Sequence, residues 1–460
     1  MKVRFCGGTR TVTGSKHLLT SGKQRLLLEC GLFQGHRAEA EQTNRSFPFK
    51  AREVNWCVIS HAHIDHVGNI PNLVKYGFRG PLLMTHGTAA LARLLVEDSA
   101  NIQESDIRYL NKKLREKGES PKEPVYTVKD AEESLKYIEG IPYAKPRKLG
   151  PYKIVLHDAG HILGSALVDI EVEGKRLLFT GDLGRRKMPI INDPVLVGEA
   201  DYLIMEGTYG NRQHGDYRDV DARLAAVVNR VYSRGGRIII PAFAVERSQE
   251  IVYTLNRLRQ NNQIPDLPVY VDSPLASRVT EVYRNHPQYY DAEAVEMLNG
   301  HQHLFDFSGL RYVESVEESK ALNLSKEPCV IISASGMCEA GRVLHHLKHS
   351  VEDPKNLVLI VSFQAENTLG RRIVERQPVV RIYGEEHPLR AEVEVMNEFS
   401  AHADHTGLVQ YVSAMNVPRL KKVFIVHSEL DAAEALVEPL KALGVREVVI
   451  PEIGEEHEIW

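Results

Sequence analysis

The sequence predicts an α/β protein in which a parallel-sheet domain is inserted into a first domain of stacked sheets covered by helices. Three observations predict this class. Short strand patterns separated by glycine turns dominate the first 208 residues, strand–helix alternation begins near Tyr209, and polar, glycine-poor strands return after Pro388. Regular alternation of strands and helices indicates a parallel sheet, whereas strand-rich segments with interspersed helices fit stacked layers.

The first region combines short strands with two helices. Each predicted strand is bounded by glycine or polar turn residues. These strands are Val3–Phe5, Leu18–Leu19, Arg25–Glu29, Cys57–Ser60, Lys153–His157, Ala166–Val172 and Arg176–Thr180. Apolar periodicity predicts helices over Leu73–Tyr76 and Thr88–Asn101, and Gly174-Lys175 predicts a hairpin turn.

The second region alternates helices with buried strands. Amphipathic patterns predict helices over Asp219–Ser233 and Arg247–Gln260. The strands between and after them are Arg237–Ile240, Val269–Val271, Cys329–Ser333 and Leu357–Ser362. The strands Arg390–Met396 and Lys422–Val426 resemble the first region again. We therefore expect a first domain over 1–208, an inserted domain over 209–387, and the rest of the first domain over 388–460.

Composition limits where the protein acts and what it binds. The 460 residues carry 57 Lys and Arg against 61 Asp and Glu, so the formal charge of −4 excludes a generic polycation. Binding to nucleic acid would need a local positive field. The five cysteines form no CxxC pair, which favours a reducing cytosol. Because no signal-peptide or membrane-spanning pattern is present, we expect a cytoplasmic protein with no membrane partner.

One short segment concentrates side chains that bind metals. After the strand Cys57–Ser60, the chain reads His61-Ala62-His63-Ile64-Asp65-His66. Core packing does not require three imidazoles and a carboxylate there, and burying them is costly unless they are paired or coordinated. A single histidine would more often be an ordinary surface or core residue. Together they predict a metal site, and zinc accepts this combination of ligands while leaving a position for water.

The HxHxDH spacing resembles the defining motif of the metallo-β-lactamase superfamily. His161, in Gly160-His161-Ile162, and Asp182, in Thr180-Gly181-Asp182, match later motifs of that superfamily in order. Taken alone, each of these two residues is more often structural. The resemblance implies a four-layer αββα fold and two zinc ions. One ion would be held by His61, His63 and His161, the other by Asp65 and His66, with Asp182 bridging them.

Further motifs resemble the β-CASP branch of this superfamily. Glu206 matches motif A, His402 in Ser400-Ala401-His402 matches motif B, and His427 in Val426-His427-Ser428 matches motif C and implies a further metal ligand. Other matching stretches are Pro241–Arg247, Asp272–Ala276, Ser335–Met337 and Gln364–Arg371. The resemblance covers essentially the whole chain and implies an inserted parallel-sheet β-CASP domain.

β-CASP proteins are nucleases, and a histidine at motif C is typical of the members that process RNA. The set is similar to bacterial and archaeal relatives of the pre-mRNA 3′-end cleavage endonuclease subunit. It implies a zinc-dependent ribonuclease in which a zinc-activated hydroxide attacks the phosphodiester bond. The enzyme would be an endonuclease, and 5′→3′ exonuclease activity is left open. A DNA nuclease of the same fold, a non-catalytic scaffold subunit and a homodimer also stay open. Glu29 replaces the usual first-motif Asp, which should perturb the metal loop without abolishing function.

The resemblance also implies roles around the metals. Asp65 would orient the hydroxide or accept its proton, and His402 would protonate the leaving oxygen while Glu206 holds its ring. The remaining candidates would bind substrate; they are Ser400, Ser333, Ser335, Gly336 and Met337. For the stretch Ser333–Met337, a plain strand-to-helix turn is an equally good explanation. Five basic residues lie between Ser105 and Lys117, and a solvated helix face is the ordinary explanation for such a run.

Overall fold

The computed structural model describes residues 1–35, 37–365 and 367–460. Glu366, within one of the predicted inserted-domain motifs, lies outside the described residues. The chain forms two compact units. The first comprises 1–186, 193–213 and 402–460, and the second comprises 187–192 and 214–401. The sequence-based boundaries at 208 and 387 stay predictions.

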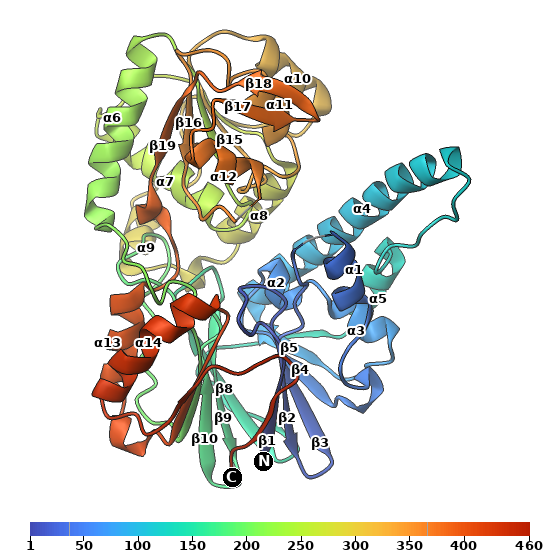
Figure 1. The fold of residues 1–460 in the computed structure, drawn as a ribbon. Coiled ribbons are helices and arrows are strands. Elements are labelled where there is room, and N and C mark those ends of the chain that lie inside the picture. Colours follow the sequence, from blue (N-terminus) through green and yellow to red (C-terminus); the bar gives the residue numbers. More distant parts are fainter. Residues whose placement is uncertain (36, 366) are drawn as a thin grey trace. The chain divides into compact units, whose positions relative to one another are not determined.

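The first unit is built on two seven-stranded sheets; in Figure 1 strands β1–β5 of the first are blue and strands β8–β10 of the second are green. The first sheet has the order β22-β1-β2-β3-β4-β5-β6 and the second the order β21-β20-β11-β10-β9-β8-β7. The strands of the first sheet are β1 (Lys2–Gly7), β2 (Lys16–Ser21), β3 (Gln24–Leu28), β4 (Trp56–Val58), β5 (Leu82–Thr85), β6 (Ile138–Ile141) and β22 (Glu456–Glu458). The strands of the second are β7 (Arg147–Leu149), β8 (Tyr152–Asp158), β9 (Ala166–Val172), β10 (Lys175–Phe179), β11 (Tyr202–Glu206), β20 (Lys422–Val426) and β21 (Val448–Val449).

Apolar side chains from both sheets form one core between them. Phe5 of β1 and Phe424 of β20 meet there with ring centroids 5.0 Å apart, and both rings are fully buried. Val423 and Ile425 point the other way, into a second core with α13 and α14. Because β20 is apolar on both faces, it must be covered on both, as strands of parallel sheets are.

Helices cover the outer faces of the two sheets (Figure 1). Helices α4 and α5 lie with β5 and β6 on the first sheet, and α13 and α14 lie on the second. The helices of this unit are α1 (Arg37–Arg45), α2 (Ile64–Val67), α3 (Ile70–Lys75), α4 (His86–Glu116), α5 (Val128–Leu135), α13 (His405–Ser413) and α14 (Leu430–Ala442), with 3-10 turns Ala51–Glu53 and Val417–Arg419. The predicted αββα layering is therefore confirmed.

The second unit contains a six-stranded parallel sheet with the order β14-β13-β15-β12-β16-β19, and a hairpin of β17 and β18. The strands are β12 (Ile238–Pro241), β13 (Val269–Val271), β14 (Leu310–Tyr312), β15 (Val330–Ser333), β16 (Leu357–Ile360), β17 (Val379–Ile382), β18 (Glu385–Pro388) and β19 (Glu392–Val395). The helices are α6 (Val220–Ser233), α7 (Arg247–Gln260), α8 (Pro274–Arg284), α9 (Ala292–Asn299), α10 (Val316–Leu324), α11 (Val343–Lys348) and α12 (Leu369–Val374), with 3-10 turns Tyr217–Asp219, Pro287–Tyr289 and Asn397–Phe399. The predicted parallel sheet is confirmed.

Two sequence-based expectations need correction. The strand expected over Arg390–Met396 is β19, which pairs in parallel with β16 of the second unit and does not return to the first. A short alternating strand carries no information about which sheet edge it joins. The helix expected over Thr88–Asn101 continues to Glu116. Its distal half is more polar but keeps a narrow apolar face, in which Ile107, Leu110 and Leu114 lie at i, i+3 and i+7 and are partly buried. Among the described residues, no helix combines the length and apolarity needed to cross a membrane.

Candidate metal centre

Three neighbouring parallel strands bring predicted site residues to one edge of the second sheet. Strand β11 pairs in parallel with both β10 and β20. Asp182 follows β10, Glu206 ends β11, and His427 follows β20 directly. The carboxyl ends of parallel strands form the edge at which open α/β sheets place their ligand sites. Topology therefore gathers residues that are more than two hundred positions apart in the sequence.

The HxHxDH segment reaches the same place from the first sheet. It leaves β4, runs through His61 and His63, and turns into the single-turn helix α2, which carries Asp65 and His66. Two glycines allow the close approach. A Cβ on Gly31 would lie 1.5 Å from the Asp65 carbonyl oxygen, and one on Gly181 would lie 2.4 Å from Ser60 Oγ. Neither position accepts a larger residue without moving the loop.

Asp182 belongs to one group of ligand-type side chains and faces a second. The first group is His61, His63, His161 and Asp182, and the second is Asp65, His66 and His427. Asp182 Oδ2 lies 3.3 Å from His61 Nε2 and 3.6 Å from His161 Nε2. Its other oxygen, Oδ1, lies 3.4 Å from His66 Nε2 and 3.4 Å from the His427 ring. Each carboxylate oxygen thus faces a different group, which is the arrangement a bridging ligand needs.

Polar partners behind the rings fix their orientation. His61 Nδ1 lies 2.9 Å from Ser60 Oγ, and His66 Nδ1 lies 3.1 Å from Glu29 Oε2. His427 Nδ1 lies 3.0 Å from Thr208 Oγ1, whose hydroxyl also lies 3.0 Å from the His427 carbonyl oxygen. For His61 and His66, Nδ1 has this outer partner and Nε2 faces the centre, whereas His427 Nδ1 also lies 3.4 Å from Asp182 Oδ1. Such partners set the tautomer and orientation of histidine ligands.

The sequence did not identify Ser60 and Thr208 as site residues. The available signal was position alone, since Ser60 directly precedes His61 and Thr208 lies two residues after Glu206. Glu29 was expected to orient the metal loop. It is fully buried, accepts a 2.7 Å hydrogen bond from the Ser60 amide and lies beside His66, so the longer side chain still reaches the loop.

Burial keeps three of these rings neutral. Burial lowers the pKa of His63 to about 3, and it lowers the pKa values of His66 and His161 well below the usual range. Burial alone would also lower the pKa of His427, but Asp182 and Asp65 raise it to about 10. Burial alone would raise the pKa of Asp65, but His66 and His427 outweigh it and lower that pKa. Neutral imidazole and ionised carboxylate are the states in which these side chains bind zinc.

The donor atoms of this centre are of the kind and arrangement that a metal ion needs. Ring nitrogens face one another closely: His63 Nδ1 lies 3.1 Å from His61 Nε2 and 3.3 Å from His161 Nε2. His66 Nε2 and His427 Nε2 are 3.2 Å apart. Among the described residues, the buried Asp182 Oδ1 accepts no hydrogen bond. Converging lone pairs and a buried carboxylate oxygen without a donor are what a cation between them would satisfy.

His402 and Glu206 form a pair beside the first group. His402 Nδ1 lies 3.1 Å and 3.2 Å from the two Glu206 oxygens, and its Nε2 lies 4.0 Å from Asp182 Oδ2. A β-bridge to Gly184 and a 2.8 Å hydrogen bond from the Ala403 amide to Leu183 hold this loop in place. Burial alone would lower the pKa of His402, but the Glu206 carboxylate raises it.

Apart from His402, which is in the first unit, the residues expected to bind substrate belong to the second unit. They are Ser333, Ser335, Gly336, Met337 and Ser400. The buried Ser333 hydroxyl donates a 2.8 Å hydrogen bond to the Asp272 carbonyl oxygen, so its side chain already has a structural partner. Ser335 Oγ accepts from the Glu339 amide at 3.2 Å. Their contact with substrate stays a prediction.

Three family models match the chain in succession. Residues 13–225 match the metallo-beta-lactamase superfamily. Residues 248–373 match the Beta-Casp domain, and residues 386–451 match the Zn-dependent metallo-hydrolase RNA specificity domain. The metal-ligand candidates fall within the first and third of these ranges, and the second range lies within the second unit.

Similar proteins extend over the full length. A ribonuclease of Thermus thermophilus is 38% identical over 455 residues, covering 99% of each chain. An RNase J-like protein of Methanocaldococcus jannaschii is 31% identical, and the alignment covers 93% of this chain and 92% of that protein. A transcription termination factor FttA of Methanosarcina mazei is 31% identical over 96% of this chain and 69% of its own.

Among solved structures, a protein of unknown function from Enterococcus faecalis V583 aligns with a TM-score of 0.58, 12% identity and 99% coverage of both chains. At that identity the likeness shows the fold alone. The full-length relatives, the three matched models and the His/Asp cluster agree with one another. This chain therefore belongs to the β-CASP branch of the metallo-β-lactamase superfamily and is a metallo-hydrolase.

Proposed function

We propose that this protein is a zinc-dependent ribonuclease that hydrolyses the phosphodiester bonds of RNA in the cytoplasm. One observation carries the proposal: the two oxygens of Asp182 face two separate groups of histidines, and His402 stands beside them. Paired metal positions bridged by a carboxylate suit in-line displacement at phosphorus, in which both the attacking and the leaving oxygen need stabilisation.

Each residue of the centre has a defined task in this proposal. His61, His63 and His161 would hold one zinc ion, and Asp65, His66 and His427 would hold the other, with Asp182 between them. When bound, the two ions would supply an activated hydroxide at neutral pH and neutralise charge on the phosphate. Asp65 is partly exposed, whereas Asp182 is buried. Asp65 is therefore the carboxylate that would orient water or accept its proton.

His402 is the proposed proton donor to the leaving oxygen. Burial lowers the pKa of His402, but Glu206 raises it and so favours the charged ring, which is the form that carries the proton to be donated. Glu206 accepts from Nδ1 and so directs Nε2 toward the centre. Ser400 and the stretch Ser333–Met337 are proposed to contact neighbouring phosphates, Ser400 through its hydroxyl and the stretch through backbone amides.

RNA is the proposed substrate because residues 386–451 match an RNA specificity model and a relative that spans 99% of the chain is named a ribonuclease. Endonucleolytic cutting is the first expectation, with 5′→3′ exonuclease activity alongside it. The test is to incubate zinc-loaded protein with circular RNA, linear RNA and DNA of the same sequence, with and without a chelator. Chelator-sensitive opening of the RNA circle is expected, and cleavage of DNA in preference to RNA would overturn the substrate assignment.

His402→Ala provides the matched test of chemistry. Cleavage should fall by about a hundredfold or more, the scale of a lost general acid, while elemental analysis still finds about two zinc ions per chain. His405→Ala, three positions along the same loop, serves as the control. His405 Nδ1 lies 2.6 Å from the Gly210 carbonyl oxygen, outside both metal groups, so this variant should keep its activity.

A further inference from the structure

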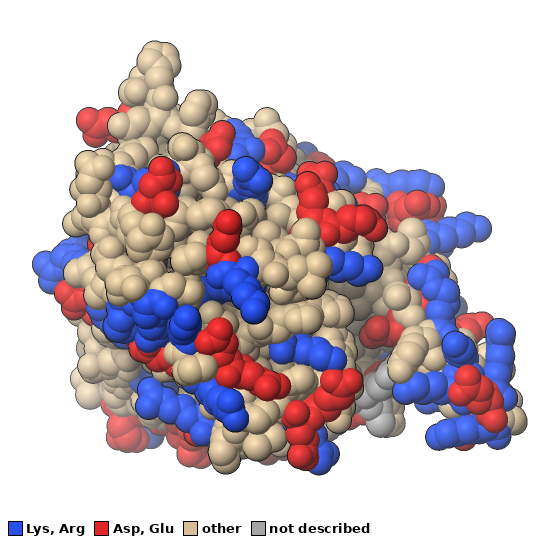
Figure 2. Space-filling view, turned by 90° about the horizontal axis from the view of Figure 1, so that it is seen from above, with Lys and Arg blue, Asp and Glu red and all other residues tan. Residues whose placement is uncertain are grey.

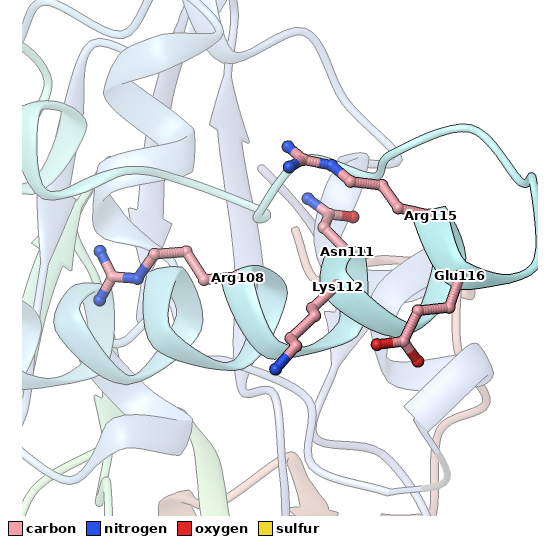
Figure 3. A pocket seen from close by; sticks show the side chains of 5 residues that line it. All are labelled: Arg108, Asn111, Lys112, Arg115 and Glu116. Atoms are coloured by element: carbon pink, nitrogen blue, oxygen red, sulfur yellow. The ribbon is translucent and has the colours of Figure 1, made fainter.

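Helix α4 is unusually long and its distal half carries an exposed row of basic side chains. The helix runs for 31 residues, from His86 to Glu116. Arg108, Lys112 and Arg115 lie at positions i, i+4 and i+7, so they share one helix face. With Asn111 and Glu116 they line an open hollow of about 410 Å³ (Figure 3). We name Arg108, Lys112 and Arg115 the basic stripe.

The charge of the basic stripe is only partly neutralised. Arg108 has 72% of its side chain exposed and forms one long ion pair, 3.9 Å from Glu104. Among the described residues, Lys112 and Arg115 have no ion pair, and neither have Lys113 and Lys117 on the neighbouring face. Figure 2 shows Lys and Arg side chains gathered over this end of α4, at the right of the view. A chain of net charge −4 thus presents a local positive field here.

Ordinary solvation of a helix face explains only part of this arrangement. Glu104 and Arg108, and Lys112 and Glu116, place opposite charges four residues apart, as stable solvated faces do. Arg108 and Lys112, and Lys113 and Lys117, are like-charge neighbours at the same spacing, which costs stability. Attraction to the helix dipole accounts only for basic residues in the last turn, and Arg108 lies about two turns before the helix end. A polyanion across the row would offset the repulsion.

An aromatic side chain accompanies the charges. Tyr109 is 63% exposed, and Lys113 Nζ lies 4.5 Å from its ring centroid. Exposed rings among cations are a feature of surfaces that bind single-stranded nucleic acid, because bases stack on the ring while the cations follow the phosphates. Tyr109 directly follows Arg108 and is therefore close to the basic stripe.

The helix is fixed at both ends. At its start, the hydroxyls of Thr85 and Thr88 donate to the Gly164 carbonyl oxygen at 2.6 Å and 2.8 Å, on the loop that carries His161. At its end, Asn111 exchanges two hydrogen bonds with the backbone of Lys122, at 2.8 Å and 2.9 Å. With a rise of about 1.5 Å per residue, Arg108 lies roughly 33 Å along the helix from its start. The basic stripe is thus held at a set distance from the metal loop.

We propose that the basic stripe and Tyr109 form an accessory binding site for single-stranded RNA, which holds a segment of the substrate away from the scissile bond. This inference rests on the proposed function for the identity of the polyanion. It predicts that long RNA binds through both the metal centre and α4, whereas a dinucleotide or a small phosphodiester binds at the metal centre alone.

The test compares two triple variants in a zinc-loaded His402→Ala background, where binding is measured without cleavage. One variant is Arg108→Gln, Lys112→Gln and Arg115→Gln. The matched control is Lys2→Gln, Lys136→Gln and Lys153→Gln, which removes the same charge from exposed cations that have acidic partners: Glu456, Glu133 and Glu171. Binding of a labelled single-stranded RNA is followed by fluorescence anisotropy over a salt series.

The stripe variant should bind RNA about tenfold or more weakly at 0.1 M salt, with a salt slope smaller by about 2, since each phosphate contact contributes about 0.7. Tyr109→Ala should weaken binding about fivefold or more without changing the slope. Equal affinities for the stripe variant and the control would overturn the proposal, as would a partner protein bound by the stripe while RNA affinity stays unchanged.

A second readout uses the same substitutions with His402 restored. The KM for long RNA should rise while hydrolysis of bis(p-nitrophenyl) phosphate stays unchanged. A fall in both activities would mean that the metal centre itself was disturbed and would overturn the assignment of a separate site. If the parent protein failed to cleave RNA at all, the proposed function would fall, but the anisotropy comparison would still decide whether α4 binds RNA.

Discussion

Replacing Glu206 with Gln tests whether His402 works as a charged proton donor. The change removes one negative charge and keeps the shape of the side chain. Glu206 is fully buried, and its two oxygens lie 3.1 Å and 3.2 Å from His402 Nδ1. A hydrogen bond to a charged group contributes about 1.5–3 kcal/mol. We therefore expect RNA hydrolysis at neutral pH to fall by about tenfold to a hundredfold.

The pH dependence gives the sharper result. Burial lowers the pKa of His402 and the Glu206 carboxylate raises it. When Gln replaces Glu206, burial remains, so the pKa of His402 should fall. Donation needs the protonated ring, so the parent rate should fall as pH rises through a pKa above the usual histidine range. In Glu206→Gln this fall moves to lower pH. The deficit should therefore grow as the pH rises and shrink as it falls, in initial rates measured on labelled RNA.

Stability and metal content must be measured beside the rates. Glu206 also accepts hydrogen bonds from the Leu183 amide at 2.6 Å and the Thr208 amide at 3.2 Å. A Gln side chain must turn its own NH₂ toward one of these donors, which costs about 1–3 kcal/mol of folding free energy. Thermal melting and zinc analysis separate this cost from chemistry. A pH profile of unchanged shape, with zinc retained, would refute the role of the Glu206 charge.

Three further substitutions test the centre and the second unit. Asp182→Ala should reduce zinc below two ions per chain by elemental analysis, because both groups lose the oxygen that faces them. Thr208→Val should weaken zinc binding by about tenfold to a hundredfold in chelator competition, with little change in melting temperature, because it frees the His427 ring. Asp272→Asn should lower the free energy of unfolding by about 3–5 kcal/mol in denaturant melts, because Asp272 is buried against His346, Ser319 and Arg342.

Each of these predictions has a result that contradicts it. Full zinc content in Asp182→Ala would exclude a bridging role, and unchanged zinc affinity in Thr208→Val would show that the His427 ring needs no partner. Burial alone would raise the pKa of Asp272, but His346, Ser319 and Arg342 lower it. The ionised Asp272 therefore stabilises the fold at every pH above the usual Asp pKa, and this stabilisation is lost as the pH falls through the lowered pKa of Asp272. A parent-minus-variant stability difference that stays constant on acidification would contradict this account.

Much of the centre could be predicted because several of its metal-ligand candidates lie close together in the sequence. His61, His63, Asp65 and His66 stand within six positions, and no packing requirement explains them. His427 lies far from that segment in sequence. Only the parallel pairing of β11 and β20 brings it to the same edge, and family resemblance supplied what spacing alone did not.

The remaining features depend on tertiary context that a single chain does not display. Thr208 looks like any turn residue until the fold sets its hydroxyl against the His427 ring. Strand β19 has the pattern of an edge strand, and nothing in that pattern selects β16 as its neighbour. Helix α4 extends past Asn101 on a narrow apolar face of Ile107, Leu110 and Leu114, and hydrogen bonds between Asn111 and the returning backbone at Lys122 hold its end.

The late position of His402 and His427 has a consequence for the protein while it is being made. Residues 214–401 form a separate unit between Glu206 and these two histidines, so translation delivers them last. Until β20 is made and joins β11, the second group lacks His427, and the proposed proton donor His402 is absent as well. On the proposed mechanism, a chain translated only as far as residue 401 would therefore be unable to cut the messenger that encodes it.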